Sequence, residues 1–210
     1  MGRAILYDYW RSSASYRVRI ALNLKGVDYE RVPVDLAAGA QADADYRARN
    51  PQGLVPMLEM DGERIVQSLA ICDFLDNVRP EPRLLPEAPA DRAHVLALAS
   101  VVAADIHPLN NLRVLKHLMG PLGVSEEAKA QWIARWIGEG FAALEAMAAS
   151  GAGRFLHGDS PSLADVFLVP QMYNARRFEV PLDAYPTLLR ADAETTAHPA
   201  FAAAHPDVGR

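Results

Sequence analysis

The fold is decided around residues 10–17, Trp10-Arg11-Ser12-Ser13-Ala14-Ser15-Tyr16-Arg17. Residues 4–9 have the pattern of a buried or half-buried β-strand, and apolar residues recur at helical spacing over 18–22. The serines therefore lie where a strand ends and a helix begins. Backbone N–H groups at that point have no partner within the helix, and the helix dipole favours an anion. The serine hydroxyls either cap the helix or donate to a bound thiolate or carboxylate, and Arg11 beside them favours an anion.

The composition argues against several classes of protein. The chain has 210 residues, of which 50% are hydrophobic, so one large domain or two small ones can bury a core of ordinary size. The net charge is −5 without a block of like charge, which argues against binding to nucleic acid or to a membrane surface. No apolar run is long enough to cross a bilayer and no signal peptide is evident, so a cytoplasmic location is expected.

Cysteine and histidine usage narrows the chemistry. Cys72 is the single cysteine, which excludes an internal disulfide and fits a reducing compartment. Because it lies in an apolar helical run, we expect a buried structural thiol and not a nucleophile. The six histidines and the acidic residues show no metal-ligand spacing, so no metal site is predicted.

Strand and helix signals alternate at the start of the chain. Residues 29–34 predict a second strand, and the β-α-β order predicts that it pairs in parallel with the first. A turn at 50–53 leads to a third strand over 54–60. Asp61-Gly62 then predicts a hairpin, and Ser68 is expected to cap the helix that follows the returning strand.

The pattern changes at residues 81–89, where repeated prolines predict a linker between two domains. The sequence after this linker has helical patterning. The predicted division is therefore an N-terminal domain at 1–80 and an all-helical domain at 90–210.

Proline and capping residues shape the helical domain. Pro108 should bend its first helix, and Pro170 should kink or break its third. Ser162 and Asp165 form a variant capping box for that third helix, and the tail to Arg210 is expected to be loose. The predicted helices cover 90–118, 125–149, 162–177 and 184–197.

Two residue pairs in the N-terminal domain carry possible binding chemistry. Val55-Pro56 is either an ordinary trans proline at a strand start or a cis bond that turns the Val55 backbone toward a passing peptide. Gln67-Ser68 stands before a helix, where Ser68 either caps the helix or offers donors to a carboxylate.

The order of these elements, β-α-β, Val-Pro, β-hairpin, a helix that begins at Gln-Ser, a linker and an all-helical part, resembles a cytosolic glutathione transferase. Residues 11–22 are similar to the signature of the zeta class, the family of the maleylacetoacetate isomerases, which usually has cysteine where this chain has Ala14. The resemblance covers nearly the whole chain in colinear order. Further matching stretches are 50–51, 55–56, 67–71, 83–86, 105–112, 168–171, 175–178 and 185–186.

The resemblance implies an α/β thioredoxin-like N-terminal domain that binds glutathione and an all-α C-terminal domain that completes the substrate pocket. It also implies a homodimer. Gln67 and Ser68 would hold the γ-glutamyl carboxylate, Val55 would pair with the cysteinyl unit through its backbone, and Gln41 would approach the glycyl end. Carried over by position, the glutathione-binding residues are Ser12, Ser13, Ala14, Gln41, Val55, Gln67, Ser68, His107 and Asn111. His107 replaces a glutamine that is common at its position.

The implied chemistry uses the sulfur of glutathione. A free thiol has a pKa of about 8.5, and Ser12, Ser13 and the helix N-terminus would lower the pKa of a thiol placed beside them. The thiolate would add to the cis double bond of a maleyl compound, the bond would rotate, and elimination would return the trans product without consuming glutathione.

Such a substrate is a dianion, and arginines suit its carboxylates. We expect the substrate to be bound by Arg11, Arg113 and Arg177. The alternative for each of them is a solvated surface arginine. Arg11 joins Ser12 and Ser13 as the catalytic set, and Arg176 is expected at the surface.

The resemblance implies a glutathione-dependent cis–trans isomerase of maleyl keto-diacids. The substrate that we expect is maleylacetoacetate, from tyrosine and phenylalanine breakdown. The alternatives are isomerisation of maleylpyruvate in gentisate breakdown, conjugation of small electrophiles by a general glutathione transferase, and a binding module without chemistry. Retention of Ser12, Val55-Pro56 and Gln67-Ser68 argues against the last.

Overall fold

The computed structural model describes residues 3–208, which form two compact units. The N-terminal unit comprises the described residues up to Arg83 together with those from Ala197 onward, and the helical unit comprises Leu84–Thr196. The boundary at Arg83 falls within the predicted linker. Each unit is described by itself.

The N-terminal unit contains a mixed sheet. Its strands are β1 (Ala4–Asp8), β2 (Tyr29–Pro33), β3 (Met57–Met60) and β4 (Glu63–Val66), in the order β2-β1-β3-β4. β1 and β2 pair in parallel across helix α1 (Ser13–Leu24), as the β-α-β pattern predicted, and the remaining pairs are antiparallel. The hairpin between β3 and β4 turns at Asp61 and Gly62, which have φ of 53° and 87°. These positive φ angles explain why Asp-Gly was a reliable hairpin signal.

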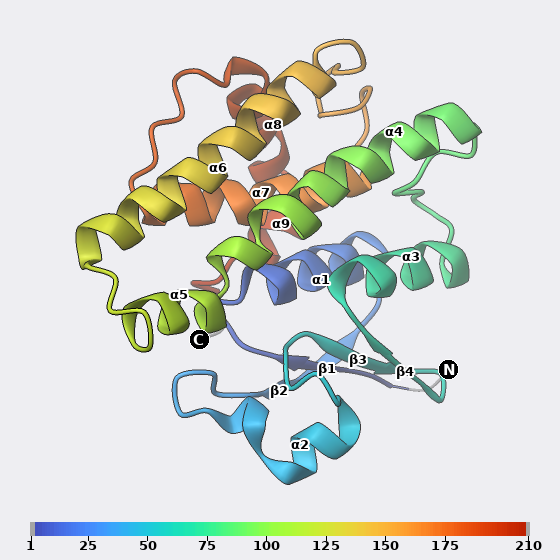
Figure 1. Cartoon of the computed structure of the whole chain (residues 1–210). Helices are drawn as coiled ribbons and strands as arrows, with labels where there is room; N and C mark the ends of the chain where they lie inside the picture. Colours follow the sequence, from blue (N-terminus) through green and yellow to red (C-terminus); the bar gives the residue numbers. More distant parts are fainter. Residues whose placement is uncertain (1–2, 209–210) are drawn as a thin grey trace. The chain divides into compact units, whose positions relative to one another are not determined.

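Helices cover this sheet unequally. α1 and α3 (Ser68–Val78) pack side by side over one face, while α2 (Ala44–Arg49) lies at the other side (Figure 1). The first face also buries an ion pair: Lys25 Nζ donates to Asp76 Oδ1 at 2.6 Å and to the Pro82 carbonyl at 2.5 Å. Because both charged groups are buried, removing either would leave its partner uncompensated. This pair therefore anchors the start of the linker region to α1.

The end of the chain returns to the N-terminal unit. α9 (Pro199–Ala204) packs on α1, where Arg19 Nε donates to the Ala204 carbonyl at 3.0 Å and Asn23 Nδ2 donates to the Ala200 carbonyl at 2.9 Å. The predicted division places this segment in the helical domain as a loose tail, which is wrong. The difference arises because long-range contacts of α1, which no local pattern reveals, hold this short helix. Residues 209–210 of the predicted tail lie outside the described residues.

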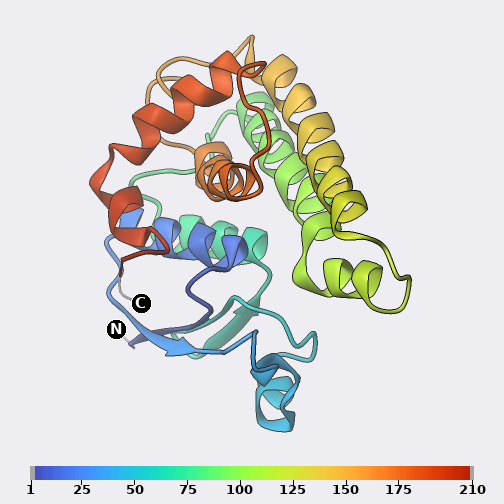
Figure 2. The ribbon, with the colours of Figure 1, turned by 90° about the vertical axis from the view of Figure 1, so that its left-hand side faces the viewer.

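The helical unit is built around one helix. Figure 2 shows α7 (Leu163–Arg177) end-on between α4 (Pro89–Ser100) and α8 (Pro186–Thr196), while α6 (Glu126–Ala148) packs against α4 and α8. Nearly all of α7 up to Ala175 is buried. Pro170 does not break α7, which is continuous to Arg177, so of the two predicted outcomes, a kink or a break, the break is wrong.

The first predicted helix of this unit is divided. After α4 the chain forms a π-helical segment, η2 (Val101–Ile106), and a 3₁₀ turn, η3 (Pro108–Asn110), before α5 (Leu112–Met119). The prediction was a single helix over 90–118 that bends at Pro108; instead the regular α-helix ends at Ser100, and Pro108, which cannot donate a backbone hydrogen bond, opens the 3₁₀ turn. The whole stretch Pro89–Met119 is long and apolar enough to cross a membrane by length and composition, which corrects the prediction that no such run exists. A core helix passes the same test, and α4 packs against α7.

The predicted capping box of α7 is confirmed, and α6 is also capped by a serine. Ser125 Oγ accepts from Ala128 N at 3.2 Å, and Asp165 accepts from the N–H and the hydroxyl of Ser162, both at 2.8 Å. Asp165 also accepts from Leu156 N at 2.9 Å. Burial raises the pKa of Asp165, and these hydrogen bonds act in the opposite direction. The capping box therefore joins the start of α7 to the preceding loop.

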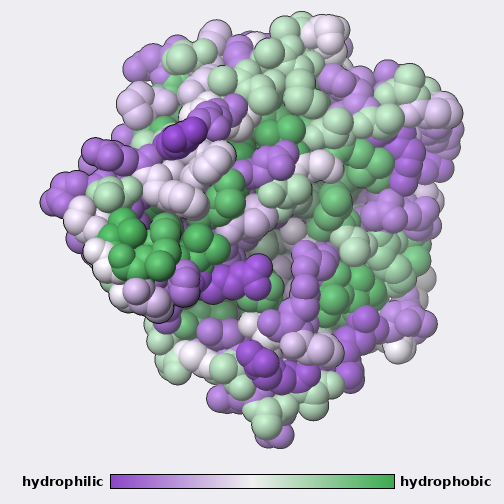
Figure 3. Space-filling view, in the orientation of Figure 1, coloured by the Kyte–Doolittle hydropathy of each residue, from purple (hydrophilic) through white to green (hydrophobic). Residues whose placement is uncertain are grey.

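α5 differs from the other helices of this unit. It has no buried residue within the described structure, although its sequence is strongly amphipathic. Figure 3 shows apolar side chains gathered at the surface near α5 and the loop after it, where Leu112 and Leu122 are exposed.

Candidate functional site

The junction of β1 and α1 presents an open helix end. Ser12 is the N-cap of α1, and its Oγ accepts from Ser15 N at 3.2 Å. Accepting this bond leaves the hydroxyl proton of Ser12 free to be donated elsewhere. The two interpretations of this serine are therefore compatible, since one hydroxyl both caps the helix and can donate to an anion.

The first turn of α1 adds further donors. Ser13 and Ala14 are largely buried, and backbone N–H groups at these positions have no acceptor within a helix. Ser15 is fully buried, and its Oγ has no hydrogen-bond partner within residues 3–208. The junction therefore combines hydroxyl groups, backbone donors and the positive end of the helix dipole.

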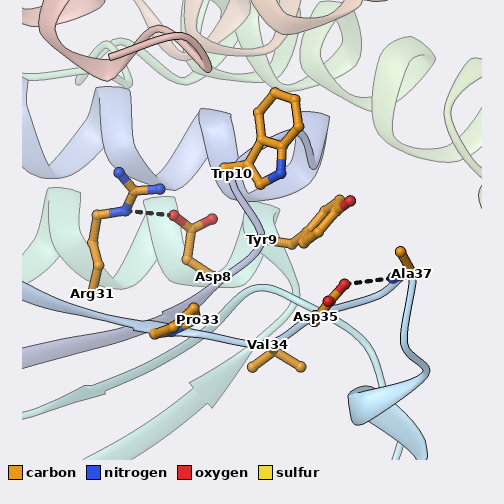
Figure 4. A pocket seen from close by; sticks show the side chains of 8 residues that line it. All are labelled: Asp8, Tyr9, Trp10, Arg31, Pro33, Val34, Asp35 and Ala37. Atoms are coloured by element: carbon orange, nitrogen blue, oxygen red, sulfur yellow. Dashed lines mark hydrogen bonds and ion pairs between the residues drawn. The ribbon is translucent and has the colours of Figure 1, made fainter. Parts of the chain in front are cut away.

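A buried ionic cluster holds this junction in place. Arg19 Nη1 donates to both carboxylate oxygens of Asp8, at 2.8 and 3.0 Å, and Arg19 Nη2 donates to the Trp10 carbonyl at 3.0 Å. Arg31 Nε donates to the same carboxylate at 2.8 Å, as Figure 4 shows. Burial lowers the pKa of Arg19, while the Asp8 carboxylate acts to raise it. Sequence analysis did not identify this cluster, because charged residues in a helix ordinarily indicate a solvated face.

A pocket of about 590 Å³ opens beside the junction (Figure 4). Its walls are mostly aromatic and aliphatic, and its two acidic groups are engaged: Asp8 by the arginines and Asp35 by the Ala37 N–H at 2.8 Å. None of the predicted site residues lines it. The lining residues are Asp8, Tyr9, Trp10, Arg31, Pro33, Val34, Asp35 and Ala37.

The loop before β3 contains Val55-Pro56, for which the sequence left open a trans or a cis peptide bond. The Val55–Pro56 peptide bond is cis. The preceding carbonyl, of Leu54, accepts from Tyr46 Oη at 2.6 Å and from Asn50 Nδ2 at 2.7 Å. These two bonds fix the loop at the residue just before Val55.

Gln41 lies beside this same loop. It belongs to the 3₁₀ turn η1 (Ala40–Ala42), and its Oε1 is buried without a hydrogen-bond partner in the described part of the chain. Gly53 makes the close approach possible, because a Cβ built there would lie 2.8 Å from the Gln41 carbonyl oxygen. The structure therefore brings Gln41 and the Val55 loop together.

Gln67 and Ser68 form a second open helix end. Gln67 has φ of 71°, a strained value for a residue other than glycine, and it makes no side-chain capping bond to α3. Its Nε2 instead donates to Gln52 Oε1 at 2.7 Å. Ser68 is buried, and its Oγ accepts from Arg17 Nη1 at 3.2 Å. The start of α3 thus keeps its own backbone donors for a ligand.

The helical unit carries the remaining predicted residues. His107 and Asn111 flank the turn η3, and Asn111 Oδ1 accepts from Arg113 N at 3.1 Å, which caps α5. Arg113 is exposed on that helix.

The two arginines at the end of α7 differ. Arg176 Nη2 donates to Asp192 Oδ2 at 2.5 Å, which ties α7 to α8. Burial raises the pKa of Asp192, and Arg176 opposes that shift. Arg177 is exposed, with its guanidinium 4.5 Å from the centroid of the Phe178 ring. Arg176 is therefore half of a structural ion pair and more than the simple surface residue that was expected.

Two other kinds of chemistry, that of a bound metal ion and that of a protein thiol, can be checked against the structure. Among residues 3–208, no cluster of three or more His, Cys, Asp or Glu side chains is placed to hold a metal ion. Cys72 is buried in α3, and burial raises the pKa of its thiol to about 12, with Arg17 nearby acting in the opposite direction. This thiol is structural, as predicted.

Comparison with known proteins identifies the family. Models described as "Glutathione S-transferase, N-terminal domain" and "Glutathione S-transferase, C-terminal domain" match residues 3–77 and 130–205. A maleylacetoacetate isomerase of Rhizobium meliloti is 54% identical over 204 residues, covering 97% of this chain and 96% of the relative. A maleylpyruvate isomerase of Ralstonia sp is 45% identical over 203 residues, covering 96% of each.

Solved structures agree with these matches. A holo maleylpyruvate isomerase, described as a bacterial glutathione S-transferase of the zeta class, has a TM-score of 0.94 and 43% identity, covering 98% of this chain and all of the other. A maleylacetoacetate isomerase of Anaeromyxobacter dehalogenans with bound glutathione has a TM-score of 0.88 and 48% identity, covering 98% and 95%. The chain belongs to the zeta class of the glutathione transferase family, which confirms the predicted fold of a thioredoxin-like and an all-helical part.

The burial of Cys72 predicts an inert thiol. In the folded protein at about pH 8, a disulfide reagent should label Cys72 far more slowly than in urea, because its raised pKa keeps the thiol protonated and burial blocks access. Cys72→Ala should retain glutathione binding and turnover. Rapid labelling of the folded protein with loss of activity would contradict the structural assignment.

Proposed function

We propose that this chain catalyses the glutathione-dependent cis–trans isomerisation of a maleyl keto-diacid, with maleylacetoacetate as substrate and fumarylacetoacetate as product. The observation that carries the proposal is the open N-terminus of α1, where the Ser12 hydroxyl caps the helix as an acceptor and keeps its proton for an anion. Relatives with about half of their residues identical are named maleylacetoacetate isomerases, which supports the choice of substrate.

The N-terminal unit fits glutathione at three places, and solved relatives of similar sequence contain glutathione. Gln67, Ser68 and the uncapped start of α3 would bind the γ-glutamyl carboxylate. The backbone of Val55, fixed by the bonds to Leu54, would pair with the cysteinyl unit. Gln41 would approach the glycyl end, where its buried Oε1, which lacks a partner in the part of the chain described, would accept from the peptide N–H of the glycyl residue.

Bound glutathione supplies a thiolate that adds reversibly to the maleyl double bond, so that the bond can rotate before the thiolate leaves. The protein's part is to keep that sulfur ionised. The Ser12 and Ser13 hydroxyls, the N–H of Ala14 and the dipole of α1 would stabilise negative charge there and lower the thiol pKa below about 8.5. Ala14 offers no thiol of its own, and Cys72 is buried in α3, so the reacting sulfur must come from the cofactor.

The substrate carries two carboxylates, and exposed arginines suit them. Arg11 follows Trp10, lies 5.2 Å from its ring centroid, and immediately precedes Ser12. Arg113 and Arg177 are the candidates on the helical unit, because Arg176 is engaged with Asp192. We assign Arg11, Ser12 and Ser13 to catalysis, and Arg11, Arg113 and Arg177 to substrate binding. His107 and Asn111 would add glutathione contacts, Asn111 through the N–H groups of its amide.

We also propose that residues 1–80 bind glutathione, that residues 90–210 bind substrate, and that 81–89 link them. A cytoplasmic homodimer, acting in aromatic amino acid breakdown without nucleic-acid or membrane partners, fits the family. Isomerisation of maleylpyruvate is the second candidate, since a maleylpyruvate isomerase gives a TM-score of 0.94. Conjugation of small electrophiles is a third.

The direct test compares turnover of maleylacetoacetate and maleylpyruvate by the purified protein, with and without glutathione. We expect isomerisation only with glutathione, a higher kcat/KM for maleylacetoacetate, and full recovery of glutathione at the end. Stoichiometric loss of glutathione would indicate a transferase. Glutathione binding without turnover of either substrate would indicate a binding module.

Arg11 offers a test of substrate binding. Arg11→Ala should lower kcat/KM by about tenfold or more, because a guanidinium–carboxylate interaction is lost, while the Kd of glutathione stays unchanged. Arg135→Ala, on the exposed face of α6, is a matched control that should leave both constants unaltered. Unchanged turnover in Arg11→Ala would remove this residue from the mechanism.

A further inference from the structure

A buried cation lies behind the start of α3. Arg17, on α1, is 1% exposed, and its Nη1 donates to Ser68 Oγ at 3.2 Å. Burial lowers the pKa of Arg17 to about 10, so the guanidinium remains charged at neutral pH. Burying an arginine is costly, and this one lies against a helix N-terminus, which is itself positive. A positive group added to a positive helix end increases the attraction of that end for an anion.

The direction of the hydrogen bond determines what Ser68 can do. A guanidinium donates and cannot accept, so Ser68 Oγ must be the acceptor in this contact. The single hydroxyl proton of Ser68 therefore cannot point at Arg17 and is available for another acceptor. The start of α3 offers N–H donors at the same place, and Gln67 does not cap them.

α1 presents two arginines to two different neighbours. Arg19 bonds to Asp8 and the Trp10 carbonyl at the β1–α1 junction, whereas Arg17 bonds to Ser68 at the start of α3. One helix therefore organises both open helix ends of the N-terminal unit.

We propose that Arg17 is a positioning residue for the γ-glutamyl carboxylate of glutathione: it orients the Ser68 hydroxyl proton toward the ligand and adds positive potential behind it. This inference rests on the proposed placement of that carboxylate at Gln67 and Ser68. Arg17 itself stays buried and does not touch the ligand.

The test uses titration calorimetry with two ligands, glutathione and an analogue whose γ-glutamyl residue is replaced by 4-aminobutyryl and so lacks the α-carboxylate. Arg17→Met should weaken the binding of glutathione by about tenfold and the binding of the analogue by less than about twofold. The reason is that Arg17 would act on the α-carboxylate, which the analogue lacks. Arg17→Lys should recover part of the affinity for glutathione alone, since lysine can still donate to Ser68. In a Ser68→Ala background, Arg17→Met should reduce the affinity for glutathione by a clearly smaller factor than it does in the wild type.

The outcomes separate the inference from the site on which it rests. If Ser68→Ala weakens glutathione selectively but the Arg17 variants weaken both ligands equally, Arg17 is merely structural and the inference is wrong. If Ser68→Ala leaves both affinities unchanged, the carboxylate site itself is misplaced and the inference fails with it. Should Arg17→Met not fold, Arg17→Lys decides alone: a selective loss for glutathione supports the inference, and an equal or absent loss overturns it.

Discussion

The structure of the N-terminal unit depends on the buried contact between Asp8 and Arg19. The carboxylate ends β1, the guanidinium belongs to α1, and the same guanidinium holds the carbonyls of Trp10 and Ala204. Both side chains are almost completely buried, so loss of either would cost about 3–5 kcal/mol through the charge left behind. One arginine thus fixes the strand end, the turn that carries Arg11 and Ser12, and the returning helix α9. This contact thereby holds the open N-terminus of α1 against the end of β1.

The glutathione site that we propose in this unit relies on backbone groups that secondary structure leaves unused. The first turns of α1 and α3 supply N–H donors, and Val55 follows Leu54, whose carbonyl accepts from Tyr46 and Asn50. In this proposal two serine side chains add to the backbone donors: Ser12, which caps α1 as an acceptor, would donate its proton, and Ser68, which accepts from Arg17, would do the same. A flexible tripeptide with charged ends is suited to such a site, because each of its polar groups meets a fixed partner.

Local signals in the sequence predicted much of this arrangement. The strand–helix–strand order, the Asp61-Gly62 hairpin and the Ser162–Asp165 capping box are determined by neighbours along the chain, and all are confirmed. Contacts between distant residues were not predictable in this way. Arg17 and Arg19 are charged residues in a helix, and such side chains are ordinarily exposed to solvent, yet these two are among the most buried side chains. The packing of α9 on α1 and the pocket beside Trp10 also depend on residues far apart in sequence. The structural role of Arg176 likewise depends on its ion pair with Asp192, which no local pattern predicts.

The central claim is that the β1–α1 junction keeps a borrowed sulfur ionised, and the pKa of glutathione bound to the protein tests it directly. Titration of the ultraviolet absorbance of the bound thiolate should give a pKa clearly below the value of about 8.5 for a free thiol. The pKa should rise in Ser12→Gly, which retains a tolerated helix-cap residue but removes the hydroxyl. A bound thiol that titrates at or above the free value in the wild-type protein would contradict the account.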